Sequence, residues 1–231
     1  MMKKMKLEEM INKVHCWDCL EFMKQIPDKS IDLVLTDPPY NASNSNIWFK
    51  DWYKTINEEW DKWFDPIPHL DERFRIIKDW WSIVVFCSYH LLWKYLEYGK
   101  KVQQIIHWEH ITAMPAIAKV YTPVIEYAVR FSTPRYTFNK KFSDRNVIRT
   151  TKANQNWENF DHPSVKPLEL IRKLLAVHSD KWQTILDPFL WSWTTAVACK
   201  ELGRNFIGIE KEQRYVDISN QRLAHTTISL F

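Results

Sequence analysis

The chain reads Ser30-Ile31-Asp32-Leu33-Val34-Leu35-Thr36-Asp37-Pro38-Pro39-Tyr40 at the point that decides its fold. The first seven residues are mostly apolar, and such a short run is typical of a buried strand. Two consecutive prolines follow, and proline supplies no backbone N–H to a helix or a sheet. We therefore predict a strand that ends at Asp37 and a rigid loop that begins there.

The C-terminal part of the chain alternates between strand and helix patterns. We predict strands at 183–186 and 205–209 and helices at 194–202 and 213–223. Earlier apolar runs predict strands at 82–87, 104–108 and 124–131, and helical spacing predicts helices at 20–26, 91–98 and 167–178. Such alternation indicates an α/β fold, here a Rossmann-like, doubly wound and mostly parallel sheet with helices on both faces.

The bulk composition narrows the class of protein. With 231 residues and 45% hydrophobic content, the chain suits a single domain, residues 1–231, that buries a core. We expect no membrane span, because no apolar run reaches about 18 residues. The cysteines are scattered, and Cys16-x-x-Cys19 has no second half, so we expect no metal and no redox centre. These features favour the cytoplasm, and the net charge of +4 permits a polyanionic partner.

Three of the predicted strands end in an acidic residue: Asp37, Asp187 and Glu210. In a doubly wound sheet, ligands bind outside the carboxyl ends of the strands, so these side chains should lie at the binding edge. Glu210 follows Asp187 by 23 residues, close to the spacing at which an acid binds a ribose diol. The alternative is that each acid only caps the helix that follows it.

The loop Asp37-Pro38-Pro39-Tyr40 suits chemistry on the exocyclic amine of a nucleic-acid base. Such an amine is a poor nucleophile because its lone pair is delocalised into the ring. A carboxylate or carbonyl acceptor beside the nitrogen would stabilise the positive charge that develops as the amine reacts. The prolines would fix these acceptors in place. The ring of Tyr40 could stack on a base flipped out of the duplex.

Several segments closely resemble the family of DNA amino-methyltransferases. They are Trp17-Asp18-Cys19-Leu20-Glu21-Phe22-Met23 through Asp37-Pro38-Pro39-Tyr40-Asn41, His162-Pro163-Ser164-Val165-Lys166-Pro167, and Ile185-Leu186-Asp187-Pro188-Phe189-Leu190-Trp191-Ser192-Trp193-Thr194-Thr195. The catalytic motif precedes the cofactor motif, and this permuted order resembles the β group of the family. A parallel sheet keeps its pocket wherever the chain opens, so the permutation is compatible with the fold.

The resemblance implies S-adenosylmethionine as the cofactor, and it implies roles for the matching residues. Asp37 and the Pro38 carbonyl would hold the target amine, Pro39 would complete the rigid loop, and Tyr40 would stack on the base. Asp18 and Cys19 would meet the adenine of the cofactor, and Glu210 its ribose. The other cofactor-binding residues, most of them around the methionine end, would be Ser164, Lys166, Asp187, Phe189, Ser192, Thr194 and Thr195. For Lys166, a solvated lysine at a helix start is the alternative.

The cofactor loop departs from the family pattern Asp-Pro-Phe-x-Gly-Ser-Gly-Thr-Thr. This chain has Trp191-Ser192-Trp193 where the pattern has Gly-Ser-Gly, and the two indoles should fill the space of the methionine moiety. Trp17, Trp182 and one or both of Trp80 and Trp81 also stand where glycine is usual.

The tryptophan and glycine counts suggest a reason for this departure. The chain holds 13 Trp and only 3 Gly, which together match the roughly 16 glycines that an average content of about 7% predicts for this length. We hypothesise that many of these tryptophans are glycines in the natural protein, encoded by UGA codons that mean glycine but were translated as tryptophan. The alternative is a genuine, degenerate and inactive relative.

Asp rather than Ser at position 37 favours adenine, by family habit rather than by physics. The first hypothesis is therefore a site-specific DNA methyltransferase that acts on the N6 amino group of adenine. The alternatives are a cytosine-N4 enzyme with the same machinery, an inactive DNA-binding or partner-binding relative if Trp191 and Trp193 are genuine, and an RNA or protein methyltransferase.

The expected partner is double-stranded DNA, with a homodimer and a cognate restriction endonuclease of a restriction-modification system as further candidates. The loops at 41–75 and 132–160 carry basic residues among aromatic and polar side chains, which could follow a phosphate backbone. A solvated loop surface explains the same residues nearly as well.

Overall fold

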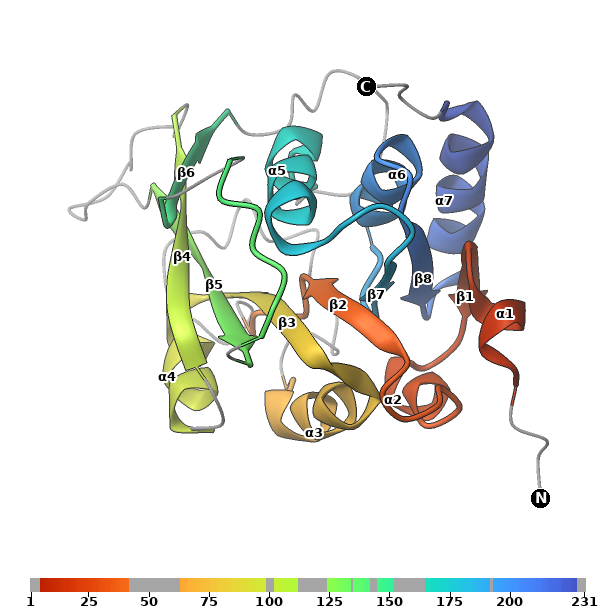
Figure 1. Ribbon diagram of the computed structural model, residues 1–231, viewed down its shortest axis with the longest axis horizontal. Coiled ribbons are helices and arrows are strands. Elements are labelled where there is room, and N and C mark those ends of the chain that lie inside the picture. Colours follow the sequence, from red (N-terminus) through yellow and green to blue (C-terminus); the bar gives the residue numbers. More distant parts are fainter. Residues whose placement is uncertain are drawn as a thin grey trace.

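The computed structural model describes residues 5–41, 63–98, 102–111, 124–133, 135–141, 145–151, 165–191 and 193–227. In this part of the chain, eight strands form one sheet in the order β1-β8-β7-β2-β3-β5-β4-β6 (Figure 1). The strands are β1 (Lys13–Cys16), β2 (Ile31–Thr36), β3 (Ile77–Cys87), β4 (Val102–His110), β5 (Ile125–Ser132), β6 (Val147–Thr150), β7 (Thr184–Asp187) and β8 (Asn205–Glu210).

Most neighbouring strands of the sheet run parallel. The run β1-β8-β7-β2-β3 is parallel throughout, and β4 and β6 are also parallel. Only β5 is antiparallel to its neighbours, β3 and β4. The predicted mostly parallel sheet is therefore confirmed.

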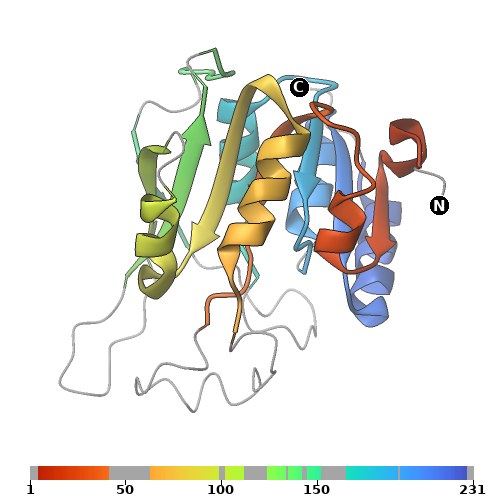
Figure 2. The same ribbon diagram turned by 90° about the horizontal axis from the view of Figure 1, so that it is seen from below.

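Helices cover both faces of this sheet. The helices α2 (Cys19–Met23), α3 (Pro66–Ile76) and α4 (Tyr89–Glu97) share one face, and Figure 2 shows them in front of the sheet. The opposite face carries α5 (Leu168–His178), α6 (Thr194–Glu201) and α7 (Gln213–His225), while the short α1 (Leu7–Met10) precedes β1 (Figure 1). Each face has its own hydrophobic core, in which residues such as Phe22 and Leu70 on one side and Leu175 and Ala198 on the other are fully buried. This two-sided burial is what a doubly wound sheet requires.

The chain changes direction at the centre of the sheet, between β2 and β7. From β2 it proceeds through α3 to β3 on one side, whereas from β7 it proceeds through α6 to β8 on the other. The two connections leave the sheet in opposite directions, which opens a crevice at the carboxyl ends of β2 and β7. Asp37 and Asp187 lie at these two ends, so the fold brings together the two segments that the sequence singled out.

The expected loop regions contain more regular structure than the sequence suggested. Residues 66–76 form α3, which begins with Pro66 and buries Leu70 and Ile76 completely. Within the other range, β6 pairs with β4. Residues 42–62 and 152–164 lie outside the described residues. Along the described ranges, every helix is too short or too polar to cross a membrane.

Candidate active site

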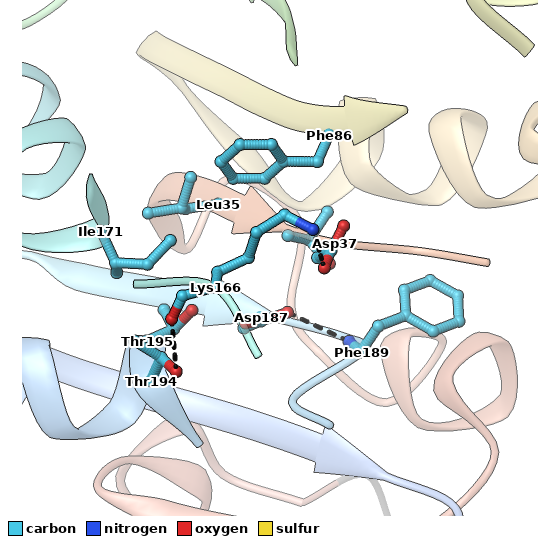
Figure 3. Close-up of a pocket in the computed structure, with 10 residues that line it drawn as sticks. Leu35, Asp37, Phe86, Lys166, Ile171, Asp187, Phe189, Thr194 and Thr195 are labelled. Carbon is cyan, nitrogen blue, oxygen red and sulfur yellow. Dashed lines mark hydrogen bonds and ion pairs between the residues drawn. The ribbon is translucent and has the colours of Figure 1, made fainter. Parts of the chain in front are cut away.

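Asp37 lies directly after β2, and Pro38 and Pro39 behind it are buried. Both oxygens of its carboxylate accept hydrogen bonds: Oδ1 from the Tyr40 hydroxyl at 2.6 Å and Oδ2 from Lys166 Nζ at 2.7 Å. Figure 3 shows the lysine side chain extended toward this carboxylate. Burial raises the pKa of Asp37 above its usual range, although the Lys166 ammonium and the Tyr40 hydroxyl act in the opposite direction.

A second carboxylate, Glu126 on β5, also reaches Lys166. Its Oε2 lies 3.2 Å from Lys166 Nζ, and its Oε1 lies 3.1 Å from Nε2 of the buried His110 on β4. Burial alone would raise the pKa of Glu126, but Lys166 and His110 hold it at about 2. Sequence analysis did not single out either residue. The available signal was a glutamate inside an otherwise apolar strand pattern, Ile125-Glu126-Tyr127-Ala128-Val129.

A narrow pocket of about 260 Å³, partly open to solvent, lies between these groups and the cofactor segment. It is lined from several elements by Leu35, Thr36, Asp37, Phe86, Lys166, Ile171, Asp187, Phe189, Thr194 and Thr195 (Figure 3). Lys166 joins its two ends, because its carbonyl accepts a hydrogen bond from Thr194 Oγ1 at 3.2 Å while its ammonium reaches Asp37. The pocket thus connects residues predicted for the catalytic motif with residues predicted for the cofactor motif.

Asp187 and Glu210 lie at the carboxyl ends of neighbouring parallel strands, β7 and β8. Burial raises the pKa of each of these carboxyls to about 7. Hydrogen bonds partly oppose this shift: Asp187 accepts from the Phe189 amide at 3.1 Å, and Glu210 accepts from the Glu212 amide at 2.8 Å. Two buried acids without an ion pair to a cation among the described residues favour a ligand that offers hydrogen-bond donors.

Asp18 and Cys19 lie beside Glu210, since the Trp17 amide donates to the Glu210 carbonyl at 3.0 Å. The Asp18 carboxylate caps α2 by accepting hydrogen bonds from the amides of Leu20 and Glu21. Cys19 is buried, and its Sγ lies 3.6 Å from His69 Nδ1.

Ser164 and Ser192 lie outside the described residues. Cys16 and Cys19 are both free thiols, and within the described ranges no three His, Cys, Asp or Glu side chains gather as metal ligands would.

Two of the unexpected tryptophans adopt left-handed backbone conformations. Trp182 has φ +68° and Trp193 has φ +50°, values that favour glycine. The Trp193 indole packs against the Arg222 guanidinium of α7, and neither Trp191 nor Trp193 belongs to the lining of the described pocket. At Trp193 the indole therefore lies against Arg222 and not in the described pocket. The departure from the glycine of the family pattern is seen there in the backbone conformation.

Comparison with known proteins identifies relatives across almost the whole chain. The family model described as DNA methylase, for N6 and N4 methyltransferases, matches residues 31–221. The Type II methyltransferase M.HinfI of Haemophilus influenzae is 29% identical over 96% of this chain and 71% of its own length. M2.MboI of Moraxella bovis, also a Type II methyltransferase, is 30% identical over 91% of this chain and 86% of its own.

Solved structures agree with this result. The M1.HpyAVI complex with S-adenosylmethionine superposes with a TM-score of 0.69 at 26% identity and covers 91% of this chain and 98% of that one. The cytosine-N4-specific PvuII methyltransferase, at 17% identity, has the same fold, with a TM-score of 0.71 over 90% of this chain and 85% of that one. Because the family model extends over most of the sheet and both candidate motifs, the chain belongs to the DNA methylase family of N6 and N4 methyltransferases.

Proposed function

We propose that this DNA methylase transfers a methyl group from S-adenosylmethionine to the N6 amino group of adenine in double-stranded DNA. One observation carries the proposal: the Asp37 carboxylate, on its proline-fixed loop, faces a pocket at the switch point of the sheet and already binds an N–H donor at 2.7 Å. An acceptor that binds an ammonium group is suited to an amine on which positive charge develops.

The residues of the pocket fit the cofactor chemically. Asp187 and Glu210 are buried acids, and their hydrogen-bonding needs match the amino group and the ribose diol of S-adenosylmethionine. Thr194 and Thr195 form the first turn of α6, whose positive end suits the carboxylate of the methionine moiety. Asp18 and Cys19 would meet the adenine, and Phe189 would pack beside the cofactor. Its sulfonium supplies the methyl group.

The chain's own residues would prepare the amine for reaction. Asp37 and the Pro38 carbonyl would accept the two N–H groups of the target amine and favour a pyramidal nitrogen, while Pro39 keeps the loop rigid. Tyr40 would stack on the flipped base. We assign no proton acceptor beyond Asp37, whose pKa burial raises.

DNA would approach along the basic residues of the ranges 41–75 and 132–160. Among the described residues of the second range, Lys140, Lys141 and Arg149 are exposed, and Arg149 also pairs with Glu109 at 2.8 Å. We propose Lys140 and Lys141 as phosphate contacts, because both are basic and exposed. A homodimer and a cognate restriction endonuclease remain partners to be tested.

Nucleoside analysis tests the proposal directly. Unmethylated bacterial DNA is incubated with the protein and S-adenosylmethionine, digested to nucleosides and analysed by mass spectrometry, with long-read sequencing of the same DNA to locate the modified site. We expect N6-methyladenine at a short recurring sequence. N4-methylcytosine in its place would support the second candidate activity and refute the assignment to adenine.

A further inference from the structure

The ammonium group of Lys166 occupies a cage of unusual composition. Only 3% of the side chain is exposed, and two carboxylates bind the nitrogen, Asp37 at 2.7 Å and Glu126 at 3.2 Å. Three aromatic ring centroids, of Tyr40, Phe86 and Trp108, lie 5.1, 5.2 and 5.7 Å from Nζ, within the range of cation–π attraction. The cage is therefore built for a positive charge.

Under the proposed function, on which this inference rests, the same lysine competes with the target amine for the Asp37 carboxylate. Both oxygens of Asp37 already accept hydrogen bonds, one from Tyr40 and one from Lys166. A target amine that binds Asp37 therefore competes with these two donors for the acceptor sites of one carboxylate. Because a buried ammonium that loses its counterion is strongly destabilised, Lys166 cannot simply be left unpaired.

Glu126 is already in place as a second partner for this lysine. It belongs to β5, where it pairs with Trp108 of β4, so its backbone is fixed by the sheet rather than by a loop. Its other oxygen lies 3.1 Å from Nε2 of His110, which is itself 5% exposed. Lys166 and His110 keep the pKa of Glu126 at about 2, so the group remains an anion at any working pH. When Lys166 shifts toward Glu126, the protonation state of Glu126 therefore does not have to change.

We infer that Glu126, held by His110, is a positioning residue that keeps the Lys166 ammonium in the aromatic cage when Asp37 exchanges this lysine for the target amine. Glu126 acts through Lys166 and does not touch the reacting atoms. The exchange alters hydrogen bonds only, and no bond to carbon or sulfur forms or breaks in it. A carboxylate that served only the stability of the sheet would have no such effect on Asp37.

Acetylation of lysines, followed by mass spectrometry, tests the two-partner arrangement without cofactor or DNA. Acetic anhydride modifies unprotonated, accessible amines, and Lys24, with 53% of its side chain exposed, provides the internal reference. In Asp37→Asn and in Glu126→Gln, we expect Lys166 to react at least about tenfold more slowly than Lys24, because one carboxylate remains in each variant. In the double variant the buried ammonium has neither carboxylate, and Lys166 should react faster relative to Lys24 than in either single variant.

The result for Asp37→Asn decides this part of the inference. If Lys166 in that variant reacts as fast as in the double variant, then Glu126 does not hold the lysine and the inference is overturned. Circular dichroism melts of the same samples separate a local release of the lysine from global unfolding. Because this readout requires no methyl transfer, it remains decisive even if the proposed function fails.

Steady-state kinetics test the consequence for the reaction. In Glu126→Gln we expect kcat/KM for DNA to fall about 10- to 100-fold, with the Kd for S-adenosylmethionine unchanged, since the variant impairs only the release of Asp37. His110→Gln should act in the same direction with a smaller effect. The matched control is Glu109→Gln, which removes a carboxylate of the same sheet from its exposed pair with Arg149 and should leave kcat/KM unchanged. Equal kinetics for Glu126→Gln and Glu109→Gln would refute the positioning role.

Discussion

The loops that follow β2 and β7 begin side by side in the sheet, but their residues suit their backbones to different degrees. After β2, the first left-handed residue is Asn41, with φ +53°. Asparagine tolerates this conformation, and its side chain bonds both the amide and the carbonyl of Phe64, at 2.8 and 3.0 Å. After β7, the left-handed position at the start of α6 holds Trp193, with φ +50° and no cap from its side chain.

The two loops therefore differ in how well their residue types match their backbone conformations. The acceptor loop of Asp37 carries residue types that its conformation demands. The cofactor loop demands a permissive residue at position 193 and contains one of the largest side chains, at a cost of about 1–2 kcal/mol for a non-glycine residue in the left-handed region. The groups that we propose for methyl transfer thus match their backbone, whereas the mismatch lies in the backbone of the proposed cofactor loop.

The largest expected effect comes from the acceptor loop. Asp37→Asn removes the charge that would stabilise the reacting amine, and we expect methyl transfer to fall about 10²- to 10³-fold with cofactor binding retained. Tritium transfer from S-adenosylmethionine to DNA measures the rate, and calorimetry measures the binding. Asp79→Asn, an identical substitution in an exposed ion pair with Lys29, is the control and should have no effect. Full activity in Asp37→Asn would remove the basis of the proposed function.

The next effect concerns the burial of Asp187 and its consequence for stability. Its folded pKa of about 7 lies well above the usual value. Below about pH 4, Asp187 is protonated in both the folded and the unfolded state. Between about pH 4 and 7 it ionises only in the unfolded state, so the free energy of unfolding falls as pH rises. Above about pH 7 this loss of stability is complete. Asp187→Asn should therefore gain stability relative to the wild type as pH rises from 4 to 8, by roughly 2–4 kcal/mol. Urea titrations at several pH values would show it, and a difference that stays constant with pH would argue against a buried acid.

A smaller effect is expected at the cofactor loop. Trp193→Gly relieves the left-handed position, although it also removes the contact with Arg222. We expect the free energy of unfolding to rise by about 1–2 kcal/mol, since the left-handed strain is relieved in the folded state. We also expect the affinity for S-adenosylmethionine to rise, because glycine lets a cofactor approach the backbone closely. Calorimetric titration of wild type and variant measures the change.

Trp182→Gly is the matched control for that prediction. Trp182 is 76% exposed and has φ +68°, but it lies in the turn before β7 rather than at the pocket. The variant should raise the free energy of unfolding by about 1 kcal/mol and leave cofactor affinity unchanged. If both variants changed affinity equally, the effect could not be attributed to the cofactor loop.

The codons for these tryptophans test the hypothesis of a reassigned codon. The positive φ values at Trp182 and Trp193 agree with glycine, whereas Trp81 and Trp108 are buried in the two hydrophobic cores as ordinary large residues are. UGA codons at positions 191 and 193 would support translation of glycine codons as tryptophan. UGG codons there would exclude it.

The sequence predicted those parts of the molecule that depend on local pattern. The apolar run at residues 31–36 and the prolines after it were sufficient to place Asp37 at the end of a strand, and the later strand–helix alternation predicted the parallel half of the sheet. Asp187 was expected at the same edge, because it also ends a predicted strand, and β7 indeed pairs with β2 in parallel. In residues 41–68 the sequence indicated only a loop and a short helix, and the extent of α3 (Pro66–Ile76) was not expected, because Pro66 and Pro68 interrupt the helical pattern although proline suits the first turn of a helix.

The Lys166 cage could not be predicted in the same way. Lys166, Glu126 and His110 are brought together by the register between β4 and β5 and by a lysine side chain that crosses from the cofactor segment to the acceptor loop. Neither the register between two predicted strands nor the direction of a long side chain follows from residue spacing. The resemblance implied a place for Lys166 at the methionine end of the cofactor; in the structure its carbonyl accepts from Thr194, and its ammonium lies at Asp37.

The most direct test of the central claim measures the transfer of a labelled methyl group from S-adenosylmethionine to DNA. Three proteins are compared: the chain with Trp191 and Trp193, the Trp191→Gly/Trp193→Gly variant, and that variant with Asp37→Asn added. An intact acceptor loop beside a mismatched cofactor loop predicts that the glycine variant labels DNA much faster than the tryptophan chain, and that Asp37→Asn abolishes the gain. A glycine variant that binds S-adenosylmethionine and DNA but leaves the DNA unlabelled would contradict it.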